Sequence, residues 1–135
     1  MNIGQAAAAA GVSPKLIRYY EQIGLVRPAA RTAANYRHFD ERNIHELRFI
    51  RVARSLSLSV PEIAELLSLW RDPGRDPEAV RAMADARVRQ LEEHAAGMSQ
   101  MAEALRDLAA TCAQGRRPDY PVLKPAPPQG QLPDR

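Results

Sequence analysis

The sequence predicts a mainly α-helical fold in which a winged helix-turn-helix domain is followed by one long dimerisation helix. Three observations predict it: a short helix with both ends specified between Ser13 and Gly24, a hairpin signal after it, and a helical pattern from Pro77 to about Thr111. The 135 residues are 45% hydrophobic, enough for one modest core, and the mean hydropathy of -0.41 indicates a soluble globular chain.

The first helix is predicted by a cap and an alanine run. Asn2 and Gln5 form a weak capping box, and alanine has the highest helix propensity, so we expect a helix from about Ile3 to Ala10. Gly11 then breaks it. Together with the helix that follows, this segment reads as a helix-turn-helix with its second helix placed for the major groove.

The second helix begins at a cap and ends at a glycine. Ser13 is the cap, Pro14 fits the first position because its missing N–H would be unpaired there, and Gly24 supplies the left-handed residue. A helical period of about 3.6 residues turns Leu16, Ile17, Tyr20 and Ile23 inward and Lys15, Arg18, Tyr19 and Gln22 outward. Such cations can bind phosphate or guanine, so the outward face predicts a DNA-reading surface; a merely solvated basic face is the alternative.

A hairpin wing is predicted next. Leu25, Val26 and Pro28 suggest one short strand and residues 36–39 a second, with Asn35 at the tip because it tolerates a positive φ. The side chains that flank the bend and could grip a phosphate are Arg31, Tyr36 and Arg37.

Two further helices follow the wing. Asp40 caps the third, and the box from Ser59 to Glu62 opens the fourth, which ends at the turn 72–74. The expected inward residues are Ile44, Leu47, Phe49, Ile50, Val52 and Ala53, then Ile63, Leu66, Leu67 and Trp70. Arg48, Arg51 and Arg54 fall on or near the other side of the third helix, as DNA contacts or as solvated charge.

The long helix carries an apolar seam. Asp76 and Pro77 read as its cap and first position, and a heptad spacing aligns Ala84, Leu91, Met98, Leu105 and Cys112, with Val88, Ala95, Ala102 and Ala109 four residues on. A seam of this length cannot be buried by the small preceding domain. It requires a partner helix, most simply from a second copy of the chain.

Charge and composition narrow the function. Residues 1–54 hold nine Lys or Arg and four acids, whereas residues 55–135 hold ten and twelve, so the first part is the expected DNA face. No stretch resembles a membrane span or a signal peptide, and the single cysteine, Cys112, agrees with a reducing compartment, so we expect a cytoplasmic protein. No phosphate loop, catalytic carboxylate pair or activated nucleophile is recognisable, so we do not expect an enzyme.

Several motifs stand together in the first half: Asn2-Ile3, Gly11, Ile17-Arg18-Tyr19-Tyr20-Glu21, Gly24-Leu25-Val26, Arg31, Asn35-Tyr36-Arg37, Ile50-Arg51 and Ala53-Arg54. In this spacing they resemble the MerR family of bacterial transcriptional regulators, densely over residues 1 to about 70 and along the long helix to about 112. In length, in the Asp72-Pro73 turn and in Cys112, the chain is most similar to the copper-efflux branch.

The resemblance implies a homodimer whose two heads are held apart by an antiparallel coiled coil of the long helices. Such a dimer binds an over-long promoter spacer, and an effector makes it underwind and bend the DNA, so RNA polymerase is affected indirectly. By position, Lys15 and Arg18 would meet base edges or phosphate, and the backbone would be contacted by Tyr20, Arg31, Tyr36, Arg37 and Arg54. Tyr20 could satisfy both this role and the inward face by burying its ring and extending its hydroxyl.

The division of the chain follows from these elements and the resemblance. We expect a winged helix-turn-helix DNA-binding domain at 1–70, a linker turn at 71–76, a dimerisation helix at 77–111, an effector loop at 112–122 and a disordered proline-rich tail at 123–135. Six of the eleven prolines lie in the last eighteen residues, which cannot build a core.

The expected metal site differs from that of the copper-efflux regulators in its second ligand. Copper-efflux regulators hold a soft monovalent ion between two loop cysteines; Cys112 matches the first, but Tyr120 occupies the second position and a neutral phenol is a poor ligand for such an ion. A tight two-thiolate Cu(I) site therefore cannot form within one loop. Cys112 is left as a seam residue, a relic or altered site for a soft metal, or a thiol that senses oxidant or electrophile.

Three functions remain open. The first is a dimeric regulator that distorts promoter DNA in response to an effector such as Cu(I). The second is a regulator that bends DNA without an effector or in response to thiol chemistry. The third, from a different class, is a metal- or thiol-sequestering protein in which DNA plays no part.

Overall fold

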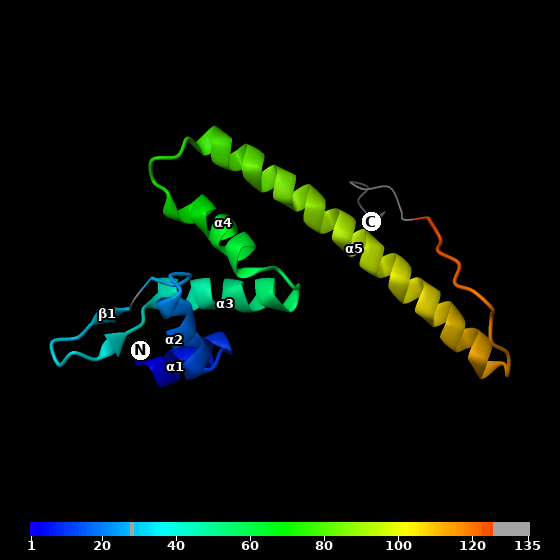
Figure 1. Ribbon diagram of the computed structural model, residues 1–135, viewed down its shortest axis with the longest axis horizontal. Helices are drawn as coiled ribbons and strands as arrows, with labels where there is room; N and C mark the ends of the chain where they lie inside the picture. The colour runs from blue at the N-terminus through cyan, green and yellow to red at the C-terminus, as the bar shows by residue number, and fades with distance from the viewer. Residues whose placement is uncertain (28, 126–135) are drawn as a thin grey trace, which may run out of the picture. The chain divides into compact units, whose positions relative to one another are not determined.

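The computed structural model describes residues 1–27 and 29–125 and is mainly helical, which confirms the predicted fold class (Figure 1). The chain divides into two compact units at the Gly74–Arg75 boundary, inside the expected linker. We call residues 1–74 the head. The elements are α1 (Ile3–Ala10), α2 (Pro14–Gln22), β1 (Ala30–Arg31), β2 (Arg37–His38), α3 (Glu41–Ser55), α4 (Val60–Arg71) and α5 (Pro77–Ala113).

The helix ends of the head are set by the predicted residues. Asn2 Oδ1 accepts from the Gln5 N–H at 2.8 Å, and Gln5 Oε1 accepts from the Asn2 N–H at 2.9 Å. Ser13 Oγ accepts from the Leu16 N–H at 3.1 Å. Gly11 and Gly24 adopt φ of 72° and 79°, a region that costs most other residues strain. Both predicted helices of the helix-turn-helix are therefore confirmed.

The core of the head lies where α1, α2, α3 and α4 meet the base of the hairpin. α1 packs on α2 and on α3, and the alanines of α1 allow that close approach. The largest fully buried side chains are Phe39, Ile17, Leu47, Ile50, Ile63 and Val26. Most of the predicted inward residues of α3 and α4 are thereby confirmed.

Four predicted inward residues are exposed instead. Leu16 and Ile23 keep 39% and 40% of their surface, and Val52 keeps 50%, because each helix of a small domain covers only a narrow stripe of its neighbour. Trp70 keeps 70% and packs edge-on to Phe49, with ring centroids 5.3 Å apart at 72°. The prediction that these four residues are buried is wrong for the single chain.

The wing is a hairpin of two-residue strands, and its first strand lies later than expected. Ala30 pairs with His38 and Arg31 with Arg37 in an antiparallel register, and Asn35 has the predicted positive φ of 66°. Leu25 and Val26 are buried but form no strand, because both of their N–H groups donate to Tyr20 O at the end of α2. Pro28, expected in that strand, lies outside the described residues.

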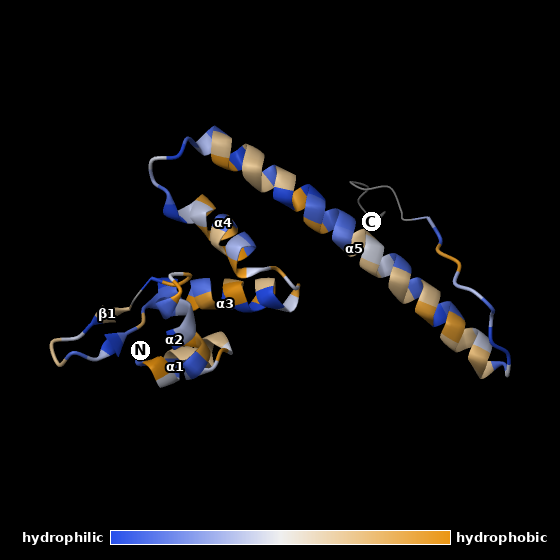
Figure 2. Cartoon of the chain, viewed as in Figure 1, coloured by the Kyte–Doolittle hydropathy of each residue, from blue (hydrophilic) through white to orange (hydrophobic). Residues whose placement is uncertain are grey.

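α5 is a single helix of 37 residues, about 55 Å long at about 1.5 Å per residue. Asp76 and Pro77 stand at the predicted cap and first position, although the Asp76 side chain makes no capping hydrogen bond. The helix ends at Ala113, so Cys112, expected to open a loop, lies in its last turn. Hydrophobic and hydrophilic residues alternate along its length, and none of its residues is buried within the chain (Figure 2).

The segment after α5 turns back along it as far as the structure describes it. Gln100 Nε2 donates to Lys124 O at 2.8 Å, and Lys124 Nζ lies 3.4 Å from carboxylate oxygens of both Glu103 and Asp107. The first residues of the expected disordered tail are therefore tied to α5, and residues 126–135 lie outside the described part. Among the described residues, no helix is long and apolar enough to cross a membrane.

Candidate nucleic-acid interface

The outward face of α2 is free, as predicted. Lys15, Arg18 and Tyr19 are exposed, whereas Ile17 is fully buried on the opposite face. The ring of Tyr19 lies 6.0 Å from that of Tyr20, so a buried ring supports the exposed one. Two cations and a phenol on the open face of a short capped helix can contact phosphates and base edges.

Tyr20 is oriented by the core. It keeps 4% of its surface, as the helical period predicted, which leaves little of it to reach a DNA backbone. Its backbone carbonyl accepts the N–H groups of Leu25 and Val26 and so closes the end of α2. Its contact with DNA, implied by the resemblance, stays a prediction.

The tip of the wing is closed by its own side chains. Arg31 Nη1 donates to Asn35 O at 3.0 Å, and Thr32 Oγ1 accepts from the Tyr36 N–H at 3.2 Å. Arg31 and Tyr36 are exposed on this closed tip. A cation and a phenol on a short rigid turn can hold a phosphate without first ordering a loop.

Arg37 is engaged inside the head. Its Nε lies 3.2 Å from Glu21 Oε1, and the Arg37 side chain is about one-third exposed. Arg37 was predicted as a phosphate contact, and part of its guanidinium is paired instead with a carboxylate of α2. The residue that holds it, Glu21, stood in the Arg18-to-Glu21 motif but was given no role.

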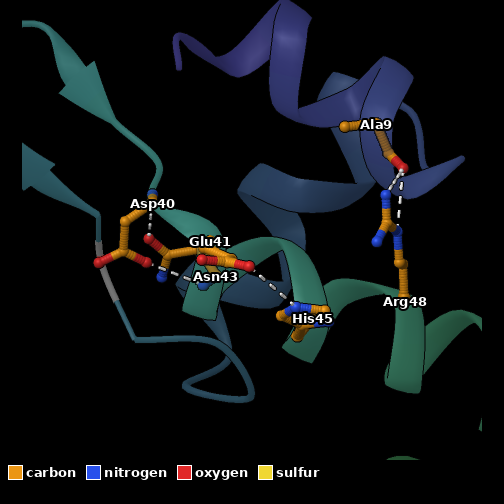
Figure 3. Close-up of polar contacts among 6 residues, drawn as sticks. All are labelled: Ala9, Asp40, Glu41, Asn43, His45 and Arg48. Atoms are coloured by element: carbon orange, nitrogen blue, oxygen red, sulfur yellow. Dashed lines mark hydrogen bonds and ion pairs between the residues drawn. The ribbon is translucent and has the colours of Figure 1, made fainter.

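Two of the four arginines of α3 donate hydrogen bonds within the head. Arg48 donates from Nε and Nη2 to Ala9 O at 3.1 and 3.0 Å, which satisfies a carbonyl at the end of α1 (Figure 3). Arg54 Nη1 donates to Leu58 O at 3.1 Å. Both guanidinium groups stay exposed, so each keeps donors for phosphate, but the fork of Arg48 is a packing contact that sequence reasoning missed.

The start of α3 follows directly from β2 and is tightly capped. Asp40 Oδ1 accepts from the Asn43 N–H and Asn43 Oδ1 accepts from the Asp40 N–H, both at 2.9 Å (Figure 3). Glu41 lies 3.6 Å from His45 Nε2 on the exposed side of the same helix. These local contacts fix where the wing ends and the helix begins.

A second ion pair locks α4 to the rest of the head. Arg71 Nε lies 2.7 Å from Glu46 Oε2, and Arg71 Nη1 donates to Leu25 O at 2.9 Å. One guanidinium thus joins α3, α4 and the turn after α2. Both side chains are mostly buried, so the removal of either would leave an unpaired charge.

The predicted seam residues of α5 are left uncovered in the single chain. Val88, Leu91, Met98 and Leu105 are all exposed, and Ala84 is partly exposed. Exposure of large apolar side chains along one helix marks a surface that another apolar face must cover.

The two residues predicted around a metal lie on different segments, Cys112 in the last turn of α5 and Tyr120 after the helix. Cys112 is an exposed free thiol, and Tyr120 is exposed on the returning segment. Among the described residues, no group of three or more His, Cys, Asp or Glu side chains is placed to hold a metal ion. One thiol and one phenol do not fit a two-thiolate Cu(I) site.

Comparison with known proteins agrees with this geometry. Residues 1–70 match the model of the MerR HTH family regulatory proteins, and residues 44–108 match the MerR DNA-binding model. The chain is 48% identical to the HTH-type transcriptional regulator HmrR of Sinorhizobium medicae (strain WSM419), over 92% of this chain and 84% of the relative.

Two further matches carry metals in their names. Heavy metal-dependent transcription regulator 2 of Rhizobium meliloti (strain 1021) is 47% identical over 92% of this chain and 84% of its own length. The crystal structure of the transcription regulator PbrR691 from Ralstonia metallidurans CH34 in complex with lead(II) is 31% identical, with a TM-score of 0.53 over 82% of this chain and 87% of that one.

Proposed function

Because this chain belongs to the MerR family of helix-turn-helix regulators and is a DNA-binding transcriptional regulator, we propose that it acts as a homodimer that distorts promoter DNA. The observation that carries the proposal is the pairing of a basic helix-turn-helix head with a long helix none of whose apolar residues is buried. Its partners are promoter DNA and a second copy of the chain, and it acts in the cytoplasm. It is not an enzyme.

The DNA contacts are assigned to the free cationic surface of the head. Lys15, Arg18 and Tyr19 on α2 enter the major groove and contact base edges or phosphates. Arg31, Tyr36 and Arg54 hold the backbone on either side, with the unpaired donors of Arg37. Tyr20 contributes through its hydroxyl alone, because its ring belongs to the core.

The dimer is assigned to the seam of α5. An antiparallel pair of helices would cover Ala84, Val88, Leu91, Met98 and Leu105 and place the two heads at a fixed span. That span, set by a helix of about 55 Å, selects two half-sites at a defined spacing.

The regulatory step is a change in DNA shape. If an effector binds one dimer conformation more tightly than another, it shifts the population, and the paired heads transmit the change as bending and underwinding of the spacer. RNA polymerase then responds to the altered spacing of its recognition elements rather than to a direct contact.

The effector is best proposed as a soft heavy-metal ion, because a relative at 47% identity is named heavy metal-dependent and the structure of another holds lead(II). Cu(I) is the inherited expectation of the copper-efflux branch. The donors here do not complete a two-thiolate site, so an intact Cu(I) response requires a ligand beyond Cys112 and Tyr120.

The exposed thiol of Cys112 favours one alternative, a regulator whose DNA bending responds to thiol oxidation or alkylation. Bending without any effector and sequestration of metal or thiol reagents without DNA are the remaining hypotheses. The DNA test below separates the last of these from the others.

The DNA-binding proposal is tested with a duplex that the wild-type protein selects from a random pool. We expect a two-fold symmetric site whose affinity falls steeply with salt, because phosphate contacts release counterions. Arg18→Ala should cost about 1–3 kcal/mol of binding free energy, whereas Arg81→Ala on α5 should change it little. Selection of no site, or equal effects of the two substitutions, would contradict the assignment.

The metal proposal is tested by titration of the reduced dimer with a cuprous ion against a competing chelator. We expect weak binding to the wild type, because it offers one thiol, and tightening by orders of magnitude in Tyr120→Cys, which restores a second. Equal affinities for the two proteins would exclude this pair of positions as a shared site.

A further inference from the structure

Glu21 is the one acid of α2, and it lies on the side of the helix that meets the wing. Its side chain is 8% exposed. Oε2 accepts from the Ala29 N–H at 3.0 Å, and Oε1 lies 3.2 Å from Arg37 Nε. One carboxylate therefore binds two points of the wing from the helix that carries the outward cations.

The two points lie at the start of β1 and at the turn-side end of β2. Ala29 directly precedes β1, and Arg37 is the first residue of β2, where it pairs in register with Arg31. A carboxylate that binds both strands fixes the direction in which the hairpin leaves the head. Strands of two residues each cannot define that direction by themselves, since an isolated hairpin is marginal in water.

The two oxygens of this carboxylate are held in different ways. Oε2 accepts the Ala29 N–H, whereas the buried Oε1 has no hydrogen-bond partner among the described residues and is compensated by the charge of Arg37. A carboxylate this deeply buried loses its hydration, so its charge depends on that guanidinium and on the one amide. Other links at the wing base come from burial and from the N-terminus. Ala29 and Phe39 are buried, the Phe39 N–H donates to Met1 O at 2.7 Å, and the Met1 ammonium donates to Phe39 O at 2.9 Å and lies 3.4 Å from His38 Nδ1. These links hold the base in place, but none of them joins the wing to α2 through a charge.

We propose that Glu21 is a positioning residue for promoter recognition. It sets the wing against α2 so that Arg31 and Tyr36 reach phosphates while Lys15 and Arg18 lie in the groove. Part of the role assigned to Arg37 is then to receive this carboxylate rather than to bind DNA. The inference rests on the proposed function, because it presumes that the head reads DNA with both elements.

The direction in which Glu21→Gln changes DNA affinity distinguishes a positioning role of Glu21 from a purely electrostatic one. Glu21 is an anion in a DNA-binding head, so removal of its charge alone should tighten binding to a polyanion. Loss of a fixed wing should weaken binding to the selected site in spite of the extra positive charge. The two accounts therefore predict opposite changes for Glu21→Gln.

The experiment measures affinity for the wild-type-selected duplex and for a random duplex by competition. Glu21→Gln should weaken binding to the selected duplex about tenfold or more, and the salt slope should fall by about one for each phosphate that the wing no longer binds. Its affinity for the random duplex should stay or rise. Glu41→Gln is the matched control: it removes the same charge from an exposed side chain and should leave the site preference unchanged.

A readout without DNA follows the wing itself. Trypsin should cleave after Arg31 several times faster in Glu21→Gln than in the wild type or in Glu41→Gln, with helical circular dichroism unchanged. Glu21→Asp keeps the charge but is one methylene too short to reach both partners, so it should behave like Glu21→Gln in both assays. If Glu21→Gln fails to fold, Glu21→Asp still tests whether Glu21 positions the wing.

The outcomes are distinguishable. If the wild type selects no site, the proposed function fails, and the cleavage rates still show whether Glu21 fixes the wing. If the wild type selects a site but Glu21→Gln binds it equally or more tightly, and wing cleavage is unchanged, the positioning role is overturned.

Discussion

The head and α5 satisfy their apolar residues in opposite ways. The described part of the head buries sixteen hydrophobic residues, whereas α5 buries none of its 37 residues. The head is also closed by specific polar contacts, such as the Arg71 contact to Glu46 and Leu25, whereas the contacts on α5 are exposed. This difference is the basis for the proposed dimer, in which a second copy of the chain covers the apolar side chains of α5.

The largest expected effect comes from a charge in the seam. Leu91→Glu should dissociate the dimer, because two carboxylates would have to be buried without partners. Affinity for the selected two-fold site should fall about a hundredfold or more, since the two heads no longer bind together. Sedimentation and competition binding measure both effects.

The control for this variant lies on another face of the same helix. Ser99→Glu adds the same charge at an exposed position outside the seam and should leave the dimer intact. A Leu91→Glu protein that sediments as a dimer would break the comparison between the head and α5.

A cavity in the head should produce a smaller effect that stays in the head. Leu47→Ala, at a fully buried position of α3, should cost about 2–5 kcal/mol of unfolding free energy. Thermal circular dichroism should show an early head transition, while sedimentation still reports a dimer, because α5 is stabilised by its partner. Val52→Ala, on the exposed side of α3, should change little. Loss of the dimer together with the head would show that the two units are not independent.

The smallest expected effect concerns the segment that returns along α5. Attraction to Asp107, with help from Glu103, raises the pKa of Lys124 above its ordinary value of 10.5. A raised pKa means that this ion pair is fully formed below the ordinary value and breaks as the pH rises through the higher one. Nitrogen-15 relaxation of the Lys124 side chain should therefore show increased motion at strongly alkaline pH.

Lys124→Met should loosen residues 118–125 at neutral pH, with the dimer and DNA affinity unchanged, because an exposed ion pair contributes little. If residues 118–125 are as resistant to proteolysis in Lys124→Met as in the wild type, apolar contacts rather than the ion pairs hold this segment on α5.

Local chemistry explains why so many element boundaries could be predicted. The caps at Asn2, Ser13, Asp40 and Ser59 each depend on two residues three positions apart. Asn35 has a positive φ, which asparagine tolerates better than most residues. The predicted strand at 25–28 failed for the converse reason. Leu25 and Val26 look extended by composition, but their N–H groups are taken by the end of α2.

The sequence predicted which residues belong to the candidate site but not which groups those residues contact. Lys15, Arg18 and Tyr19 could be placed outward from the helical period alone. The ion pair of Arg37 with Glu21 joins positions sixteen residues apart in the sequence, so no local sequence pattern predicts it. The same holds for Arg48, whose acceptor at Ala9 belongs to a helix 39 residues earlier.

The sequence by itself determined the helices, most of their ends, the tip of the wing, the basic outward face of α2 and the heptad spacing of apolar residues along α5, because these depend on neighbours within one or two turns. Only the tertiary structure decided which apolar residues are covered, where the wing strands pair and which cations are already engaged. Those outcomes depend on distant segments that compete for the same donors and surfaces, and burial is settled by that competition rather than by residue type.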